Sequence, residues 1–377
     1  MEFDFSEVLT RMVEMRASDV HLTSGFPPAI RIRGRIVPME EYPRLNPQQT
    51  REVVYSIIND DQRKRFENNK QLDFAYSIPG VGRFRINCYF QRGAISAAFR
   101  AIPHDILSLE QLGLPMILEE FTRKPRGFVL VTGPTGSGKS TSLAAMIDLI
   151  NSTREEHILT IEDPIEFLHR HQKCIVNQRE IGADADDFAT ALRAGLRQDP
   201  DVILVGEMRD LETISTALTA AETGHLVFAT LHTQSTAQTV DRIIDVFPAA
   251  QQNQVRMQLS IALQGIVTQQ LLPTADGAGR VSACEVLIPT PAIRNLIREG
   301  KTHQIYSAIQ TSGAVGMRTM DSHLAQLVRM GKITRSLAEQ RASVPEELKR
   351  LMGGMQAPAQ STGATPDAGS LAGAMPR

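Results

Sequence analysis

The sequence predicts an α/β protein with a core built on a parallel sheet, preceded by a smaller mixed α+β domain. A complete phosphate-binding motif, G-x-x-x-x-G-K-[ST], occupies residues 133–140, between a short apolar segment and a helical pattern. From about residue 121 onward, short apolar segments alternate with helical segments, which is typical of βαβ units. Before residue 103 the pattern differs, because short strands and isolated helices dominate there.

Residues 1–103 are expected to form the N-terminal domain. Apolar residues recur at helical spacing over residues 5–15, and residues 51–64 also have a helical pattern, so we expect one helix in each range. Isoleucine and valine alternate with arginine on both sides of Gly34, which indicates strands around a turn. Further strands are expected at 73–78, 83–90 and 95–101.

A linker at residues 104–118 is expected to lead into the nucleotide-binding domain, residues 119–352. We expect its buried strands at 128–132, 158–161, 202–205 and 226–230. A long helix is expected at 249–270, followed by short helices at 292–297, 305–310 and 321–330. Residues 353–377 contain almost no large apolar side chain, so we expect a disordered tail.

The composition limits the functional classes. The chain has 377 residues and a formal net charge of −2, so no strong global field attracts nucleic acid. No apolar run is long enough to span a bilayer, and the N-terminus does not resemble a secretory signal, so we expect a cytoplasmic protein. Cys88, Cys174 and Cys284 are far apart, which argues against a zinc site or a disulfide framework.

The phosphate-binding motif predicts binding of ATP with Mg²⁺. Its glycines let successive backbone N–H groups surround an anion, and the following helix directs its positive end toward the same place. The Lys139 ammonium can reach the β and γ phosphates, and the Ser140 hydroxyl can be a Mg²⁺ ligand. The expected nucleotide-binding residues are Gly133, Pro134, Thr135, Gly136, Ser137, Gly138, Lys139, Ser140 and Thr141.

Acidic residues follow two of the predicted strands. Glu162, Asp163 and Glu166 come after the strand at 158–161, and Glu207 follows the strand at 202–205. Ligands of open parallel sheets lie beyond the carboxyl ends of the strands, so these carboxylates should converge on the P-loop. We expect Glu207 to hold the magnesium shell and a carboxylate of the first group to orient the attacking water. The alternative is that these acids only cap helices.

Arginines and histidines supply further candidates. Arg193 and Arg197 are four residues apart and share a helix face, whereas Arg85 and Arg100 lie on neighbouring predicted strands. Guanidinium groups suit phosphate recognition, although such arginines are often solvated surface charges. His225 and His232 flank the strand at 226–230 and could sense the γ-phosphate, or they could be structural residues at strand ends.

Together these segments resemble the secretion-type ATPases of type II and type IV systems, particularly the pilus-retraction branch. The resemblance covers roughly residues 5–350. Its matching segments are ASDVHL at 17–22, GPTGSGKST at 133–141, TIEDPIE at 160–166, DVILVGEMRD at 201–210, GHLVFATLHT at 224–233, IIDVFP at 243–248, LIREGKTHQI at 296–305 and GMRTMD at 316–321.

This resemblance implies a PAS-like N-terminal domain and a RecA-like ATPase domain, with small C-terminal helices, in a ring of six subunits. By likeness, Glu166 is the expected general base with Glu162 as its rival, and Glu207 is the Walker B glutamate. His225 and His232 match a histidine box. Arg85 and Arg100 match arginines that reach a neighbour's nucleotide, and Arg193 and Arg197 match a second pair.

The implied function is an ATP-hydrolysing motor that powers type IV pilus retraction, and thereby twitching motility. Its expected partners are a platform protein of the inner membrane and, indirectly, pilin, with no nucleic acid and no membrane span of its own. The alternatives within the family are an accessory retraction ATPase and a pilus-assembly or type II secretion ATPase. An alternative of another class is a RecA-like nucleic-acid translocase.

Overall fold

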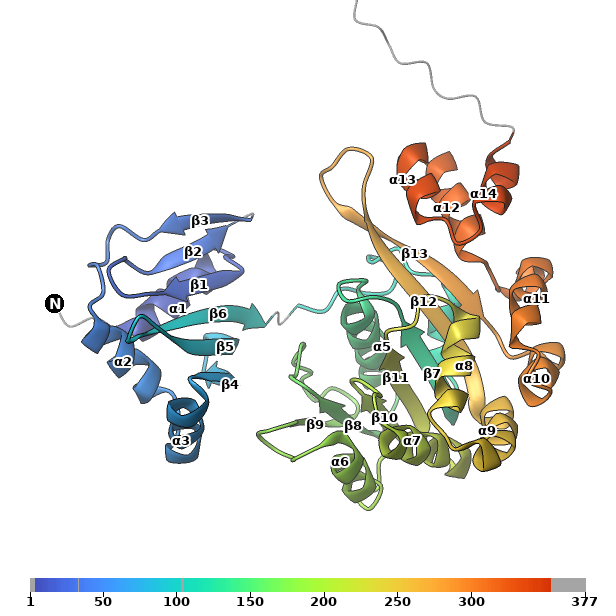
Figure 1. Ribbon diagram of the computed structural model, residues 1–377, viewed down its shortest axis with the longest axis horizontal. Coiled ribbons are helices and arrows are strands. Elements are labelled where there is room, and N and C mark those ends of the chain that lie inside the picture. The colour runs from blue at the N-terminus through green and yellow to red at the C-terminus, as the bar shows by residue number, and fades with distance from the viewer. Residues whose placement is uncertain (1–3, 33, 103–104, 354–377) are drawn as a thin grey trace, which may run out of the picture.

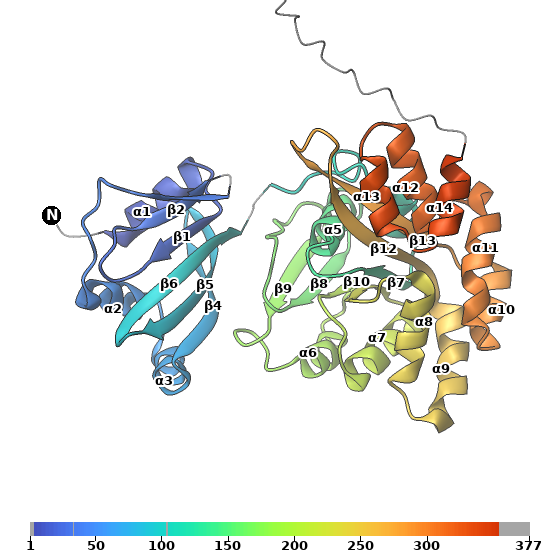
Figure 2. The same cartoon turned by 45° about the horizontal axis from the view of Figure 1, so that its top comes forward.

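The computed structural model describes residues 4–32, 34–102 and 105–353. Figures 1 and 2 show two units, each built on its own sheet. The strands of the first unit are β1 (Asp19–Leu22), β2 (Ala29–Ile32), β3 (Arg35–Pro38), β4 (Gln71–Ile78), β5 (Gly82–Gln91) and β6 (Ala94–Ile102), and its helices are α1 (Phe5–Glu14), α2 (Pro47–Ser56) and α3 (Asp60–Asn69).

The first sheet has the order β3-β2-β1-β6-β5-β4, and every neighbouring pair is antiparallel. Helix α1 contributes the buried side chains Phe5, Val8, Leu9 and Met12 to the core of this unit. The ring of Phe5 lies 4.6 Å from that of Phe99 on β6, measured between centroids. The i, i+3, i+4, i+7 spacing of these apolar residues explains why this segment is helical.

The single helix predicted over residues 51–64 is wrong, because the structure divides this region into α2 and α3. Asn59 begins the second helix with a capping box. Its side chain accepts a hydrogen bond from the Gln62 backbone N–H, and the Gln62 side chain accepts one from the Asn59 N–H. This reciprocal pair satisfies donors at a helix start, so the helix begins anew there.

The second unit contains a seven-stranded sheet in the order β13-β12-β7-β11-β10-β8-β9, parallel except for β13. Its strands are β7 (Gly127–Thr132), β8 (His157–Glu162), β9 (Ile175–Glu180), β10 (Val202–Val205), β11 (Leu226–Leu231), β12 (Leu263–Pro273) and β13 (Arg280–Leu287). Helices α4 (Ile117–Thr122), α5 (Lys139–Thr153), α6 (Phe188–Gly195), α7 (Leu211–Thr223), α8 (Thr236–Asp245) and α9 (Ala249–Ala262) accompany them.

Helices cover both faces of this sheet. On β7, Phe128 and Leu130 pack into one core with residues of α6 to α9, whereas Val129 and Val131 pack into another with α4 and α5. Every residue of β7, β10 and β11 is buried. Burial on both faces explains why these strands are continuous apolar runs, which confirms the prediction of a parallel sheet.

The long helix predicted over residues 249–270 is wrong in its second half, because α9 ends at Ala262 and β12 begins at Leu263. Strand β12 lies between β7 and β13, and Ile266, Val267 and Thr268 are fully buried there. β-Branched residues favour a packed strand, and this tertiary environment overrides the local helical pattern. Gly265 matters here, since a Cβ atom would lie 2.2 Å from the Phe121 ring.

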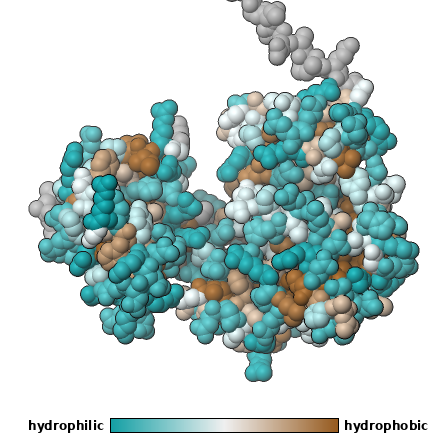
Figure 3. All heavy atoms as spheres, viewed as in Figure 1, coloured by the Kyte–Doolittle hydropathy of each residue, from teal (hydrophilic) through white to brown (hydrophobic). Residues whose placement is uncertain are grey.

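The predicted short helices near the end are present with shifted bounds, and two more follow. They are α10 (Pro291–Arg298), α11 (Ile305–Thr311), α12 (Met320–Arg329), α13 (Arg335–Arg341) and α14 (Pro345–Met352), with short 3₁₀ turns at Thr302–Gln304 and Gly313–Val315. Apart from Gly353, the tail predicted to be disordered lies outside the described residues. Among the described helices none is both long and apolar enough to cross a bilayer. The face shown in Figure 3 is mostly hydrophilic, with hydrophobic patches on both units.

Candidate active site

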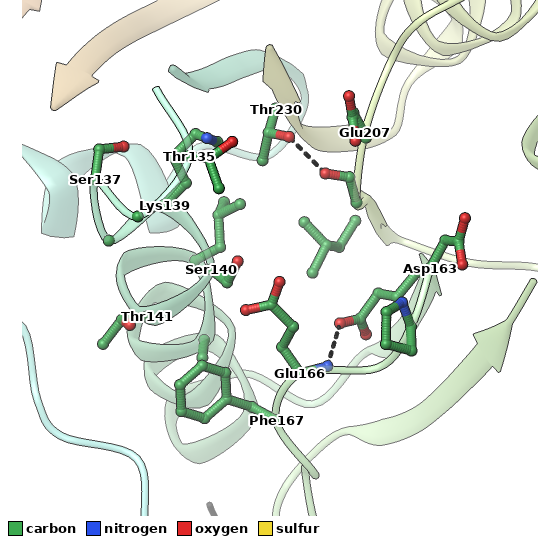
Figure 4. Close-up of a pocket in the computed structure, with 18 of the residues that line it drawn as sticks. Thr135, Ser137, Lys139, Ser140, Thr141, Asp163, Glu166, Phe167, Glu207 and Thr230 are labelled. Carbon is green, nitrogen blue, oxygen red and sulfur yellow. Dashed lines mark hydrogen bonds between the residues drawn. The ribbon is translucent and has the colours of Figure 1, made fainter. Parts of the chain in front are cut away.

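The candidate site lies at the carboxyl ends of β7, β8, β10 and β11, where the predicted motifs meet (Figure 4). These four strands are mutually parallel, so the loops that follow them all leave the same edge of the sheet. They surround a cavity of about 350 Å³, within the range of ligand pockets. Its lining includes residues 135–141, Glu162, Asp163, Glu166, Glu207 and His232.

The P-loop has a backbone that only glycine accommodates at two points. Gly133 has φ 137°, and a Cβ atom there would lie 2.3 Å from the Gln269 carbonyl oxygen of β12. Gly138 has φ 91° and precedes the first residue of α5. These conformations let the loop turn sharply after β7 and bring the amino end of α5 to the cavity. The predicted order of strand, loop and helix is therefore present.

Lys139 is buried and folds back onto the loop. Its ammonium group donates hydrogen bonds to the carbonyl oxygens of Gly133 at 2.8 Å and Pro134 at 3.2 Å. Burial lowers the pKa of this lysine, while the nearby carboxylates of Glu207 and Glu166 act in the opposite direction. The ammonium is therefore held by two loop carbonyls and interacts electrostatically with two acids.

The two rival carboxylates after β8 have different surroundings. Glu162 accepts hydrogen bonds from the Thr160 hydroxyl at 2.6 Å, the Gln178 side-chain amide at 3.2 Å and the Glu166 backbone N–H at 3.4 Å. Burial raises the pKa of Glu162 despite these donors. Glu166 is exposed, and within the described residues its carboxylate accepts no hydrogen bond. Figure 4 shows this carboxylate directed toward Ser140. Glu162 is thus held by the protein, whereas Glu166 is available to a ligand.

Glu207 lies after β10, in contact with Arg209 and His232. Arg209 donates to both of its carboxylate oxygens, at 2.5 and 2.6 Å, and the His232 Nε2 atom lies 3.1 Å from Oε1. Burial raises the pKa of the Glu207 carboxyl, but Arg209, His232 and Lys139 together bring it below its usual value. The carboxylate is thus kept ionised beside the P-loop, and His232 at the end of β11 contacts it directly.

The other predicted site residues do not line this cavity. Arg85 lies 4.0 Å from Asp73, and Arg100 lies 2.9 Å from Asp19, both within the N-terminal unit. Arg193 pairs with Glu212, and Arg197 is exposed in the turn after α6.

His225 lies at the opposite end of β11 from His232. Its carbonyl oxygen accepts from the N–H of Gly127, the first residue of β7, and its Nδ1 atom lies 3.0 Å from the Ala220 carbonyl oxygen. The six residues of β11 separate the two histidines by about 20 Å. Only one histidine of the predicted pair therefore lines the cavity.

Several lining residues were not predicted from the sequence. Phe167 and His169 follow Glu166 in the chain, and Arg280 begins β13. Burial lowers the pKa of His169 to about 4, so this imidazole is neutral at ordinary pH. Arg209 does not line the cavity, but it pairs with Glu207 and was not predicted either, although its spacing to that acid could have indicated a pair. No local sequence pattern indicated Arg280, because the β12–β13 hairpin that brings it to the cavity was not predicted.

Known proteins with related sequences support one family. The family model described as type II/IV secretion system protein matches residues 4–341. The chain is 53% identical to the type IV pilus retraction ATPase PilT of Pseudomonas aeruginosa, over 91% of this chain and 99% of that protein. It is 45% identical to the type IV pilus ATPase PilU of the same organism, over 93% and 91% of the two chains.

A solved structure agrees with these sequence matches. The crystal structure of the pilus retraction motor PilT with bound ADP is similar with a TM-score of 0.87 and 52% identity, covering 93% of this chain and all of that one. The predicted fold class, a RecA-like P-loop core with an N-terminal α+β domain, is thereby confirmed. The chain belongs to the family of type II/IV secretion system proteins.

Proposed function

We propose that this protein hydrolyses ATP and uses the energy to retract type IV pili. The observation that carries the proposal is the convergence of an intact P-loop with Glu166 and Glu207 at one cavity. The choice of retraction over other work of the family rests on the relatives. The chain is more similar to the retraction ATPase, at 53% identity, than to PilU, at 45%. Type II secretion proteins match it over smaller parts of the chain.

The residues at the cavity fit a magnesium-bound nucleotide. The Ser140 hydroxyl lines the cavity, and the Glu207 carboxylate is ionised beside it, so these two would hold Mg²⁺ directly or through water. No cluster of three or more acidic, histidine or cysteine ligands occurs in the described part of the chain. Mg²⁺ suits such a site, because it usually keeps several waters and takes substrate phosphates as ligands. When bound, it neutralises charge on the β and γ phosphates.

The protein's own groups supply positioning and charge. Lys139 and the amides of the P-loop hold the phosphates, and Glu166 orients the attacking water and accepts its proton. The free carboxylate of Glu166 favours it over Glu162, which already accepts hydrogen bonds from three donors. His232, in contact with Glu207, is placed to respond when the γ-phosphate leaves.

We further propose that the four predicted site arginines act between subunits of a homohexamer. Arg85, Arg100, Arg193 and Arg197 lie outside the cavity and are largely exposed, so a neighbouring subunit is the partner that could bring a nucleotide to them. In this proposal the N-terminal domain comprises residues 1–103, a linker follows at 104–118, and the ATPase domain with its C-terminal helices extends over 119–352.

Replacing Arg100 with alanine is expected to lower the ATPase rate of the assembled ring by about 10-fold or more, because arginine fingers stabilise transition-state charge. Nucleotide affinity measured on the isolated subunit should change less than twofold. Phosphate release and fluorescent-nucleotide titration at protein concentrations above and below assembly would test this. Equal turnover by single subunits and rings, with or without Arg100, would contradict a role across the interface.

The proposed partners are a platform protein of the inner membrane and, through it, pilin at the base of the fibre. The protein would then work at the cytoplasmic face of that membrane. Nucleic acid is not a proposed partner, since the net charge of −2 provides no attraction. Stimulation of ATP hydrolysis by DNA or RNA would instead favour a translocase.

The cellular test is a deletion strain scored for surface pili and twitching. The proposal predicts abundant pili that do not retract, loss of twitching, and recovery when the wild-type gene is supplied. Absence of pili would indicate an assembly ATPase. Retraction that persists in the deletion strain would favour an accessory retraction ATPase.

A further inference from the structure

One buried carboxylate joins the N-terminal unit to the catalytic loop. Glu180 is the last residue of β9 and is only 4% exposed. Its Oε2 atom accepts a hydrogen bond from Arg83 Nη2 at 2.9 Å and another from the backbone N–H of Ile165 at 3.1 Å. Arg83 belongs to β5 of the first sheet, whereas Ile165 immediately precedes Glu166.

We infer that Arg83 and Glu180 are positioning residues that make the placement of Glu166 depend on the position of the N-terminal domain. The inference rests on the proposed function, because it assigns Glu166 to ATP hydrolysis. Neither residue lines the nucleotide cavity. Their effect on hydrolysis is therefore transmitted through the Ile165 amide.

The RecA-like side of this link is buried and hydrogen-bonded. Glu180 pairs with Glu162 across the parallel strands β8 and β9, so it lies beside the start of the catalytic loop. Its backbone N–H donates to the Asp184 carboxylate at 2.8 Å, and its carbonyl oxygen accepts from the Asp184 N–H at 2.8 Å. Ile165 is itself buried at 3% exposure. Because the interior is tightly packed here, a shift of the Glu180 carboxylate would displace the loop that contains Ile165 and Glu166.

On the N-terminal side, Arg83 lies in the same part of the first sheet as the predicted site arginines Arg85 and Arg100. Arg83 and Arg85 are two residues apart on β5 and share one face, and Arg85 is directly opposite Arg100 on β6. Movement of this face toward or away from a nucleotide therefore moves Arg83 with it. Among the described residues, Arg83–Glu180 is the one ion pair that joins residues before 103 to residues after 104.

The Arg83–Glu180 ion pair is well shielded from solvent, which favours a strong interaction between the two domains. The side chains of Arg83 and Glu180 are 20% and 5% exposed, so solvent screens their attraction weakly. Charge-assisted hydrogen bonds are stronger than neutral ones, and removal of one partner leaves the other charge buried without compensation. Glu180 would then reorient, and the hydrogen bond that holds the Ile165 N–H would weaken.

A double-mutant cycle tests the inference on the full-length protein. Arg83→Gln removes the charge from the N-terminal side. Glu180→Gln removes the charge from the other side but keeps an oxygen that can accept from Ile165. Each single change is expected to lower kcat about 10-fold with KM changed less than twofold, since small misplacements of catalytic groups are costly. The double variant should be no slower than either single variant, because the link is already broken.

Two further variants separate positioning from general damage. Arg83→Lys keeps a charged donor, and is expected to restore kcat to at least half of the wild-type value. Arg63→Gln breaks the exposed Arg63–Glu67 pair of the same unit, 3.1 Å long, and should leave kcat unchanged. Hydrogen exchange supplies a readout apart from turnover. Arg83→Gln should accelerate exchange in the peptide that contains Ile165 and leave the P-loop peptide unchanged.

Multiplicative effects in the double variant, or unchanged kcat and unchanged exchange at Ile165 in Arg83→Gln, would overturn the inference. These results are distinct from failure of the proposed function. If the wild-type protein did not hydrolyse ATP, the proposed function would be wrong. If the wild-type protein is active but the double-mutant cycle shows no coupling between Arg83 and Glu180, only their positioning role is wrong.

Discussion

Lys139→Ala is expected to reduce ATP hydrolysis by at least about 100-fold, because it removes the charged donor beside the transferring phosphoryl group. In the structure the ammonium is held by the carbonyl oxygens of Gly133 and Pro134 and lies in the field of Glu207 and Glu166. Without the ammonium group, the carboxylates of Glu207 and Glu166 would repel the phosphates of ATP. Affinity for ATP should therefore fall together with turnover.

Phosphate release and nucleotide binding by the purified variant would measure both effects. Lys173→Ala is a matched control, since Lys173 lies in the same domain and is exposed, outside the cavity. The control is expected to retain wild-type kcat. Wild-type turnover by Lys139→Ala would show that the P-loop is not the hydrolytic site.

Glu166→Gln is expected to lower kcat by about 10²- to 10⁴-fold, the usual contribution of a positioned general base. Glutamine keeps the size of the side chain but cannot take the proton of the attacking water. Because Glu166 accepts no hydrogen bond within the described residues, the change should disturb neither the loop nor nucleotide affinity. Single-turnover hydrolysis and a binding titration would separate the chemical step from affinity.

Glu162→Gln is the informative comparison for that experiment. Glu162 is already engaged by Thr160, Gln178 and the Glu166 N–H, so its replacement should slow hydrolysis far less, by less than about 10-fold through loop disturbance. A larger loss in Glu162→Gln than in Glu166→Gln would reverse the assignment. Equal, small losses would show that neither carboxylate serves as the base.

The central part of the site was predictable because its chemistry is local in the sequence. The glycines of the P-loop, Lys139 and Ser140 follow one another in the chain, and their conformation depends on the strand and helix that flank them. Glu166 and Glu207 follow strands whose apolar runs indicate burial on both faces. Parallel strands bring their carboxyl ends to one edge, so convergence of these residues followed from the strand pattern.

Other features depend on contacts between distant segments and were not predictable in this way. The second half of the expected helix at 249–270 became β12, because its apolar residues fill the space between β7 and β13. That hairpin then brings Arg280 to the cavity. The link between Arg83 and Glu180 joins residues 97 positions apart, and no local pattern marks it.

Steady-state phosphate release by the purified full-length protein, measured with ATP as Mg²⁺ is varied, is the most direct test of ATP hydrolysis at this site. We expect saturable release that requires Mg²⁺, increases as the ring assembles and is lost in Lys139→Ala. Absence of phosphate release by assembled protein at every Mg²⁺ concentration would contradict hydrolysis at the P-loop.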